Sequence, residues 1–181
     1  MTGAEQRAAA VRLLVMDVDG VLTDGRLYFG ADGEALKVFD VRDGLGVKML
    51  REAGIEVAIL SSRSSPIVER RARELGIAPV VQGSTDKGAG FAALAHARRL
   101  APAQCGYIGD DWPDLAALAQ AGFAAAVSDA SPEVRRIAHW ISEAPGGRGA
   151  VRELAEFILR AQGRFSDVLR RHGGGETASD A

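Results

Sequence analysis

The sequence predicts an α/β fold in which helices flank a parallel β-sheet. Two observations predict it. Short apolar stretches alternate with amphipathic ones along the 181 residues, and hydrophobic residues make up 47% of the chain, enough to bury one sizeable core. Strands and helices that alternate at this spacing are typical of right-handed βαβ crossovers in a doubly wound sheet.

Five apolar stretches have the length and composition of buried parallel strands. In chain order they span residues 11–18, 57–60, 79–81, 105–108 and 123–127. Helical patterns span residues 44–53, 65–75, 86–100, 112–121 and 150–162, and a short helix opens at residue 131. Serine followed by proline predicts a helix start at Ser65, and glycine predicts helix ends at Gly54, Gly76 and Gly122.

Two segments depart from this alternation. Apolar stretches flank a turn at Gly30 and Gly33, which predicts a β-hairpin inserted after the first strand, at about residues 24–42. Residues 164–181 form a polar tail with a glycine-rich end, which we expect to be partly mobile. The chain therefore divides into an N-terminal extension (1–10), one domain (11–163) and this tail.

The composition excludes several classes of protein. The net charge is −2, so no broad basic face indicates a nucleic-acid partner. The single Cys105 excludes an intrachain disulfide and a cysteine-rich zinc site. No apolar run approaches the roughly 20 residues of a membrane span, so we expect a cytoplasmic protein. Lysines are rare, because only Lys37, Lys48 and Lys87 occur among 22 basic residues.

The candidate functional residues lie where the expected strands end. Asp17 and Asp19 follow the first strand, Ser61 the second and Asp110 the fourth, while Lys87 lies beyond the third. Folds of this kind bind ligands at that edge of the sheet. Neighbouring carboxylates repel one another unless a cation neutralises them, and Mg²⁺ accepts carboxylates together with a phosphate oxygen. The pattern predicts a site that holds a phosphate group between Mg²⁺ and Lys87.

Such a site favours phosphoryl transfer. One aspartate is free to attack phosphorus and form an aspartyl-phosphate. The aspartate two positions later can protonate the leaving oxygen and then activate water. Ser61 and loop N–H groups can donate hydrogen bonds to the phosphoryl oxygens.

The motif order resembles that of the haloacid dehalogenase (HAD) superfamily of phosphohydrolases. The matching residues are Asp17-x-Asp19-Gly20-Val21-Leu22-Thr23-Asp24, Ser61, Lys87 and Gly109-Asp110-Asp111-x-x-Asp114. The resemblance implies a HAD-like Rossmannoid sheet with a hairpin insertion and no large cap domain. It implies Asp17 as the nucleophile and Asp19 as the acid and base, with Ser61 and Lys87 also catalytic. The implied Mg²⁺ ligands are Asp17, the backbone carbonyl of Asp19, and Asp110.

The fourth motif contains two further acids, Asp111 and Asp114. We expect them to support the metal site, although Asp114 could equally face solvent on the helix that follows.

A closer resemblance, from about residue 11 to residue 163, is to the 3-deoxy-D-manno-octulosonate 8-phosphate (Kdo-8-phosphate) phosphatases. It rests on residues 17–48, 61–77, 109–115 and 144–163. It implies a homotetramer in which the hairpins form a shared barrel and each active site is covered by a neighbour. The implied contacts to a phosphorylated sugar acid are Asp19, Asp40, Val41, Arg42, Asp43, Gly44, Lys48, Ser62, Arg63, Arg71 and Lys87. Ser62 replaces a usual glycine, and Asp40 stands where asparagine is common.

Two alternatives stay open. The same chemistry could act on KDN 9-phosphate, a nine-carbon sialic-type sugar acid phosphate, or on a general sugar phosphate. Arg63 favours the eight-carbon acid, because the related KDN 9-phosphate phosphatases tend to carry glutamate there and an arginine fork suits a carboxylate. A non-catalytic assembly protein on a HAD scaffold is the alternative of another class, and the presence of Asp17 and Asp19 argues against it.

Overall fold

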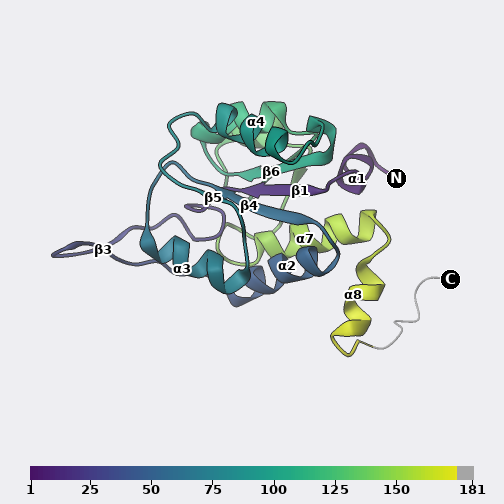
Figure 1. The fold of residues 1–181 in the computed structure, drawn as a ribbon, viewed down its shortest axis with the longest axis horizontal. Coiled ribbons are helices and arrows are strands. Elements are labelled where there is room, and N and C mark those ends of the chain that lie inside the picture. Colours follow the sequence, from purple (N-terminus) through teal and green to yellow (C-terminus); the bar gives the residue numbers. More distant parts are fainter. Residues whose placement is uncertain (175–181) are drawn as a thin grey trace.

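The computed structural model describes residues 1–174 and contains a six-stranded sheet in the order β5-β4-β1-β6-β7-β8 (Figure 1). The strands are β1 (Leu13–Met16), β4 (Glu56–Leu60), β5 (Val80–Val81), β6 (Cys105–Gly109), β7 (Phe123–Ala126) and β8 (Trp140–Ile141). Every pair in this sheet is parallel, and β1 pairs with both β4 and β6. The parallel sheet predicted from the sequence is confirmed.

Helices cover both faces of the sheet. One face carries α2 (Val41–Glu52), α3 (Pro66–Leu75) and α7 (Ala150–Ala161), and the other carries α4 (Lys87–Ala97) and α5 (Leu115–Gln120) (Figure 1). The shorter helices are α1 (Gly3–Ala9), α6 (Pro132–Ile137), α8 (Phe165–Arg171) and the 3₁₀ turns η1 (Pro102–Gln104) and η2 (Trp112–Asp114). Across residues 1–174, no helix combines the length and the apolar composition needed to cross a membrane.

The central strand β1 is the most deeply buried part of the sheet. Leu13, Leu14, Val15 and Met16 have no exposed surface. Because helices cover both of its faces, the strand is a continuous apolar run rather than an alternating one. Burial of each such side chain contributes about 1.5–3 kcal/mol. Asp17 follows this strand directly and is therefore carried by a fully buried segment of the sheet.

Three elements go beyond the sequence prediction. Helix α1 lies in the expected N-terminal extension, where Thr2 and Glu5 form a capping box and Ala8 is buried in the core. Helix α8 lies in the expected tail and buries Val168. Strand β8 adds two residues to the sheet edge, too few for an apolar pattern to reveal. The mobility expected for the end of the tail concerns residues 175–181, which lie outside the described residues.

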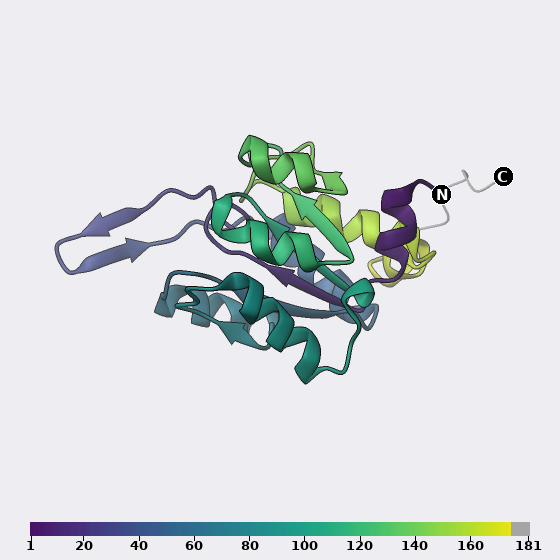
Figure 2. The same cartoon turned by 90° about the horizontal axis from the view of Figure 1, so that it is seen from above.

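The predicted hairpin is confirmed as β2 (Tyr28–Gly30) and β3 (Gly33–Leu36), an antiparallel pair. Figure 2 shows it projecting from the body of the domain. The exposed apolar side chains of the hairpin and its flanks are Leu27, Phe29, Leu36 and Val38. An apolar surface on a projecting two-stranded ribbon has few partners within its own chain.

A glycine-rich loop braces the segment that follows β1. The N–H of Gly147 donates a hydrogen bond to the carbonyl of Val21 at 2.8 Å. A Cβ atom on Gly146 would lie 1.7 Å from the carbonyl oxygen of Gly20, so only glycine fits there. On the other side, the Thr23 hydroxyl bonds to the carbonyl of Val18. The segment that carries Asp17 and Asp19 is thus fixed by backbone contacts.

We predict that Gly146→Ala destabilises the protein by about 1–3 kcal/mol, because the methyl group must displace the loop or the backbone of Gly20. Thermal and urea unfolding measure the change. The matched control is Gly3→Ala in α1, where a Cβ meets nothing within 4 Å. Equal stability of the Gly146→Ala protein and the control would show that this loop does not brace the segment.

Candidate active site

The carboxyl ends of three adjacent strands form the site. Asp17 follows β1, Ser61 follows β4 and Asp110 follows β6, while Lys87 begins α4. The chain builds β4 and β5 on one side of β1 and β6 to β8 on the other, so the strand order reverses beside β1, where ligands bind in such sheets. One pocket at this edge is lined by Asp17, Asp19, Ser61, Ser62, Arg63, Lys87, Asp110, Asp111, Pro113 and Asp114.

Lys87 joins two buried carboxylates in this pocket. Its Nζ lies 2.8 Å from Asp17 Oδ1 and 2.7 Å from Asp114 Oδ1, and its side chain is 3% exposed. Burial alone would lower the pKa of Lys87, but the charges of Asp17 and Asp114 outweigh burial and raise the pKa. The ammonium therefore stays charged and acts as a fixed positive charge beside Asp17.

Asp114 is a hydrogen-bond acceptor that connects several parts of the site. Besides Lys87, it accepts hydrogen bonds from the Tyr107 hydroxyl at 2.6 Å and from the N–H groups of Asp110 at 3.0 Å and Asp111 at 3.3 Å. Its oxygens are thus occupied by four donors, and its side chain is buried rather than facing solvent. Asp111 is exposed at the pocket rim. This placement is compatible with the expectation that Asp114 supports the metal site. Asp114 can do so through these hydrogen bonds without itself binding the metal.

The site carries more negative charge than its one ammonium balances. Burial, with the charge of Asp114, raises the pKa of Asp17 to about 7, although Lys87 opposes the shift. Burial, with the charge of Asp17, raises the pKa of Asp110 to about 8. Three carboxylates (Asp17, Asp110, Asp114) face Lys87, an excess of two negative charges when all are ionised.

These residues fit a divalent cation. Asp17, Asp110 and Asp114 offer carboxylate oxygens that all lie within 4.8 Å of one another. The excess of two negative charges equals the charge of Mg²⁺, and carboxylate oxygens are ligands that it prefers. The space beside Asp110 depends on Gly20, where a Cβ atom would lie 2.1 Å from Asp110 Oδ2. Gly20, within the first motif, therefore lets Asp110 approach the backbone of that loop.

The loop after β4 brings Ser61 and Arg63 to the same pocket. Ser61 is buried, and its Oγ accepts a hydrogen bond from the N–H of Arg63 at 3.3 Å. The adjacent Ser62 is exposed at the pocket wall. The arrangement leaves the Ser61 hydroxyl hydrogen free for an acceptor in the pocket, such as an anionic oxygen.

Two hairpin residues that the motif analysis did not assign to the site lie beside Asp19: Lys37 contacts it, and Glu34 pairs with Lys37. The ammonium of Lys37 pairs with Asp19 Oδ1, and also lies 2.9 Å from Glu34 Oε1. Arg63 bridges the same two acids, with 3.6 Å from Nε to Asp19 and 3.3 Å from its terminal nitrogen to Glu34. The sequence held one signal for this role, the rarity of lysine, but no strand-end pattern marks a hairpin residue.

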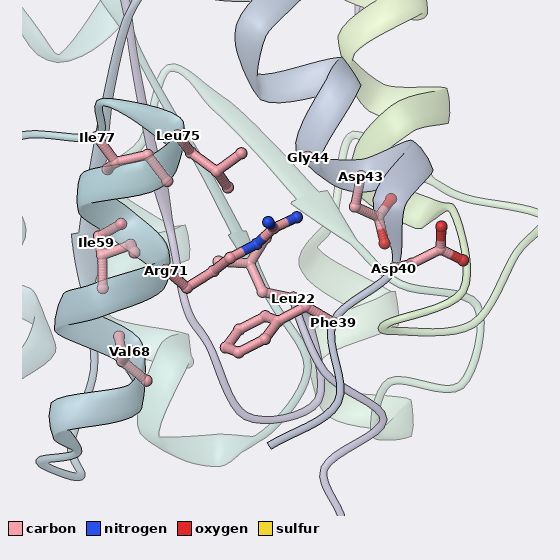
Figure 3. A pocket seen from close by; sticks show the side chains of 11 residues that line it. Leu22, Phe39, Asp40, Asp43, Gly44, Ile59, Val68, Arg71, Leu75 and Ile77 are labelled. Carbon is pink, nitrogen blue, oxygen red and sulfur yellow. The ribbon is translucent and has the colours of Figure 1, made fainter. Parts of the chain in front are cut away.

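Several expected substrate contacts lie elsewhere within one chain. A second pocket between α2 and α3 is lined by Phe39, Asp40, Asp43, Gly44 and Arg71, among others (Figure 3). The Arg71 guanidinium lies 5.8 Å from the ring centre of Phe39, a cation–π contact. A Cβ atom on Gly44 would lie 2.5 Å from a terminal nitrogen of Arg71, so glycine makes room for the guanidinium.

Asp43 and Asp40 have structural partners. Asp43 accepts hydrogen bonds from the N–H groups of Gly149 and Arg152, and so caps the start of α7. Asp40 caps α2 and pairs with Arg42 at 2.8 Å. Both carboxylates serve helix ends in the single chain, and their contact with substrate stays a prediction.

The other two predicted contacts of α2 also lie outside the Asp17 pocket. Val41 is 80% exposed, and Lys48 lines a separate surface depression with Arg51 and Glu52. The structure therefore gathers Asp17, Asp19, Ser61, Ser62, Arg63, Lys87, Asp110, Asp111 and Asp114, and leaves Asp40, Val41, Arg42, Asp43, Gly44, Lys48 and Arg71 outside that pocket. The spacing of these residues along the sequence does not indicate which of them lie in the Asp17 pocket and which lie outside it.

Comparison with known proteins shows which family the chain resembles. The family model for haloacid dehalogenase-like hydrolases matches residues 34–122. The chain is 46% identical over 160 residues to the 3-deoxy-D-manno-octulosonate 8-phosphate phosphatase KdsC of Yersinia pestis, covering 88% of this chain and 86% of that protein. It is 44% identical to the Haemophilus influenzae enzyme of the same name, covering 90% of each.

Solved structures of this group superpose closely. The Moraxella catarrhalis 3-deoxy-D-manno-octulosonate 8-phosphate phosphatase, in complex with magnesium ion, phosphate ion and KDO, matches with a TM-score of 0.92 at 41% identity, over 95% of this chain and 99% of that one. The Yersinia pestis phosphatase matches with a TM-score of 0.88 at 44% identity, over 91% and 89%. This chain therefore belongs to the 3-deoxy-D-manno-octulosonate 8-phosphate phosphatase family of haloacid dehalogenase-like hydrolases.

Proposed function

We propose that this chain is a Mg²⁺-dependent phosphatase that hydrolyses 3-deoxy-D-manno-octulosonate 8-phosphate to the free sugar acid and phosphate. The observation that carries the proposal is the buried Asp17 carboxylate, paired with Lys87 and faced by Asp110, in a chain 46% identical to a phosphatase of that name. A carboxylate so placed, beside a fixed cation, is suited to attack a phosphate monoester.

The reaction needs two balanced steps. An Asp17 oxygen attacks phosphorus, the bond from phosphorus to the sugar oxygen breaks, and Asp19 gives its proton to that oxygen. Asp19 then takes a proton from water, whose oxygen attacks the phosphorus of the aspartyl-phosphate, and phosphate leaves with Asp17 restored. Lys87 and Ser61 stabilise the charged phosphoryl oxygens as they form.

The proposed ligands of Mg²⁺ are Asp17, Asp110 and the backbone carbonyl of Asp19. When bound, the ion neutralises the carboxylates and the phosphoryl oxygens that meet there. Asp114 keeps Lys87 and the loop of Asp110 in place. Asp111 lies at the rim, where its charge adds to the attraction for a cation.

Recognition of the sugar acid would begin at Arg63. Its side chain is 42% exposed in the pocket wall, and an arginine fork binds a carboxylate with two hydrogen bonds. Ser62 borders the same space. The residues of α2 and α3 named above would reach substrate only where the second pocket or a neighbouring subunit joins the site.

We further propose that the working assembly is a homotetramer in which the hairpins pack together and each site is covered by a neighbour. The exposed apolar residues of the hairpin support this proposal, because a contiguous apolar patch on a soluble protein commonly marks an interface. Phe29 is the largest of them and is 64% exposed.

A substrate panel tests the activity. We expect phosphate release from 3-deoxy-D-manno-octulosonate 8-phosphate to exceed that from KDN 9-phosphate and from simple sugar phosphates, and to stop when a chelator removes Mg²⁺. Asp17→Asn should lower kcat on the order of 10⁴-fold or more, because the amide is a poor nucleophile. Asp167→Asn, on the exposed face of α8, is the matched control. Activity that survives both the chelator and Asp17→Asn would contradict the mechanism.

Magnesium should also stabilise the protein in a pH-dependent way. Asp17 and Asp110, with pKa values raised from 3.8 to about 7 and about 8, bind protons in the folded metal-free protein that the unfolded chain has released. Their contribution to stability is therefore full below about pH 4 and is lost as the pH rises through 7 to 8. Mg²⁺ requires the ionised carboxylates, so its stabilising effect should be larger at pH 8 than at pH 5.5.

Thermal unfolding with and without Mg²⁺ at the two pH values measures this difference. At free Mg²⁺ a hundred times its Kd, the stabilisation is about 2.7 kcal/mol. Asp110→Asn, which removes a proposed ligand with little change in volume, should abolish it. An equal rise in Tm at both pH values, or a rise that persists in Asp110→Asn, would count against the site.

The assembly is tested at the hairpin. Phe29→Glu places a charge on its apolar face and should shift the mass measured by light scattering from four chains toward fewer, since burial of one central aromatic residue contributes about 2 kcal/mol or more to an interface. Ala92→Glu, on the exposed face of α4, is the control. A tetramer that persists unchanged in Phe29→Glu would remove the hairpin from the interface.

A further inference from the structure

Lys37 is a buried cation on an otherwise exposed ribbon. It follows β3, and its side chain is 1% exposed, whereas the neighbouring Leu36 and Val38 are 46% and 51% exposed. Successive side chains of an extended strand point to opposite sides, so this register turns the ammonium inward when the apolar neighbours face out. A charge is buried at high cost unless it is paired and hydrogen-bonded.

The partners of Lys37 compensate for that cost. Its ammonium contacts Asp19 Oδ1 and lies 2.9 Å from Glu34 Oε1. The second oxygen of Glu34 accepts a hydrogen bond from the Ser65 hydroxyl at 2.6 Å. Arg63 contacts both acids from the other side. Two cations and two anions thus form a balanced network, of which Asp19 and Arg63 line the Asp17 pocket.

Burial would raise the pKa of Glu34, but the hydrogen bond from Ser65 and the charge of Lys37 outweigh it, and the pKa is lowered. Glu34 is therefore an anion that keeps Lys37 in place. Ser65 stands at the start of α3, so the network ties the hairpin to the body of the domain as well as to Asp19.

We propose that Lys37 is a positioning residue that fixes the rotamer of Asp19 for proton transfer, with Glu34 holding Lys37 in turn. The inference rests on the proposed function, in which Asp19 protonates the leaving oxygen and later activates water. Lys37 fixes Asp19 Oδ1, while Oδ2 has the longer contact of 3.6 Å to the half-exposed Arg63. A carboxylate held on one oxygen presents the more loosely held one in a defined direction, and orientation of this kind is a large part of enzymatic rate enhancement. The hairpin would then serve catalysis within its own chain as well as assembly.

The test exploits a difference between leaving groups. A sugar alkoxide needs a proton as it leaves, whereas 4-nitrophenolate does not. Lys37→Met should therefore lower kcat/KM for the sugar-acid phosphate by about tenfold to a hundredfold, and lower the formation of phosphoenzyme from 4-nitrophenyl phosphate by less than about threefold. Because hydrolysis of the aspartyl-phosphate also uses Asp19, the variant should release a pre-steady-state burst of 4-nitrophenolate that is larger than that of the unaltered protein.

Three controls accompany the measurement. Lys37→Arg keeps a cation and should restore part of the lost activity with the sugar-acid phosphate. Arg26→Met removes an exposed hairpin cation and should leave the ratio between the two substrates unchanged. The double variant Glu34→Gln/Lys37→Met removes one anion with the cation and keeps the network near charge balance. Circular dichroism and light scattering show whether Lys37→Met folds. If it does not, the double variant should show the change in activity ratio between the two substrates that is expected of Lys37→Met.

An equal loss with both substrates, or no enlarged burst in a folded variant, would overturn the role of Lys37 and leave the proposed function intact. Failure of the unaltered protein to release phosphate from the sugar-acid phosphate would instead overturn the proposed function itself.

Discussion

The site depends on one electrostatic constraint: three carboxylates, two of them buried and the third partly buried, lie together with a single ammonium. The parallel sheet creates the problem, because β1 and β6 end side by side and each is followed by an aspartate. Lys87, Tyr107 and two backbone N–H groups satisfy Asp114, which leaves Asp17 and Asp110 short of positive charge. A site in this condition attracts a divalent cation and then a phosphate group, so the affinity follows from the fold's own charge imbalance.

The hairpin is subject to a second constraint, because a short two-stranded ribbon cannot bury both of its faces within one chain. Its outward residues, such as Phe29, are exposed, and its inward Lys37 is buried against Asp19. The two faces therefore have different physical requirements: the outer one needs apolar contact and the inner one needs charge balance. Because one ribbon carries both faces, covering the outer face would also restrain the inner one.

Much of the fold and the centre of the site could be predicted from the sequence, because strand ends and helix caps leave local patterns. Asp17, Ser61, Lys87 and Asp110 follow apolar runs, and a parallel sheet brings such positions together. The roles of Asp43 and Lys37 could not be predicted in this way. Asp43 caps a helix that begins more than a hundred residues later, and Lys37 meets Asp19 only through the path of the hairpin. Both contacts depend on tertiary placement, which leaves no periodic signal.

The two cations beside Asp19 differ in a way that separates their functions. Lys37 is almost fully buried and contacts its acids closely, so it has no room to exchange partners. The side chain of Arg63 is 42% exposed, and its contacts to Asp19 and Glu34 are longer, at 3.6 and 3.3 Å. An exposed ion pair contributes little to stability, so a carboxylate arriving from solvent can replace those acids at small cost. When Arg63 turns to such a ligand, Lys37 still pairs with both Asp19 and Glu34. In the proposed mechanism, Asp19 would therefore keep its orientation while the substrate is bound.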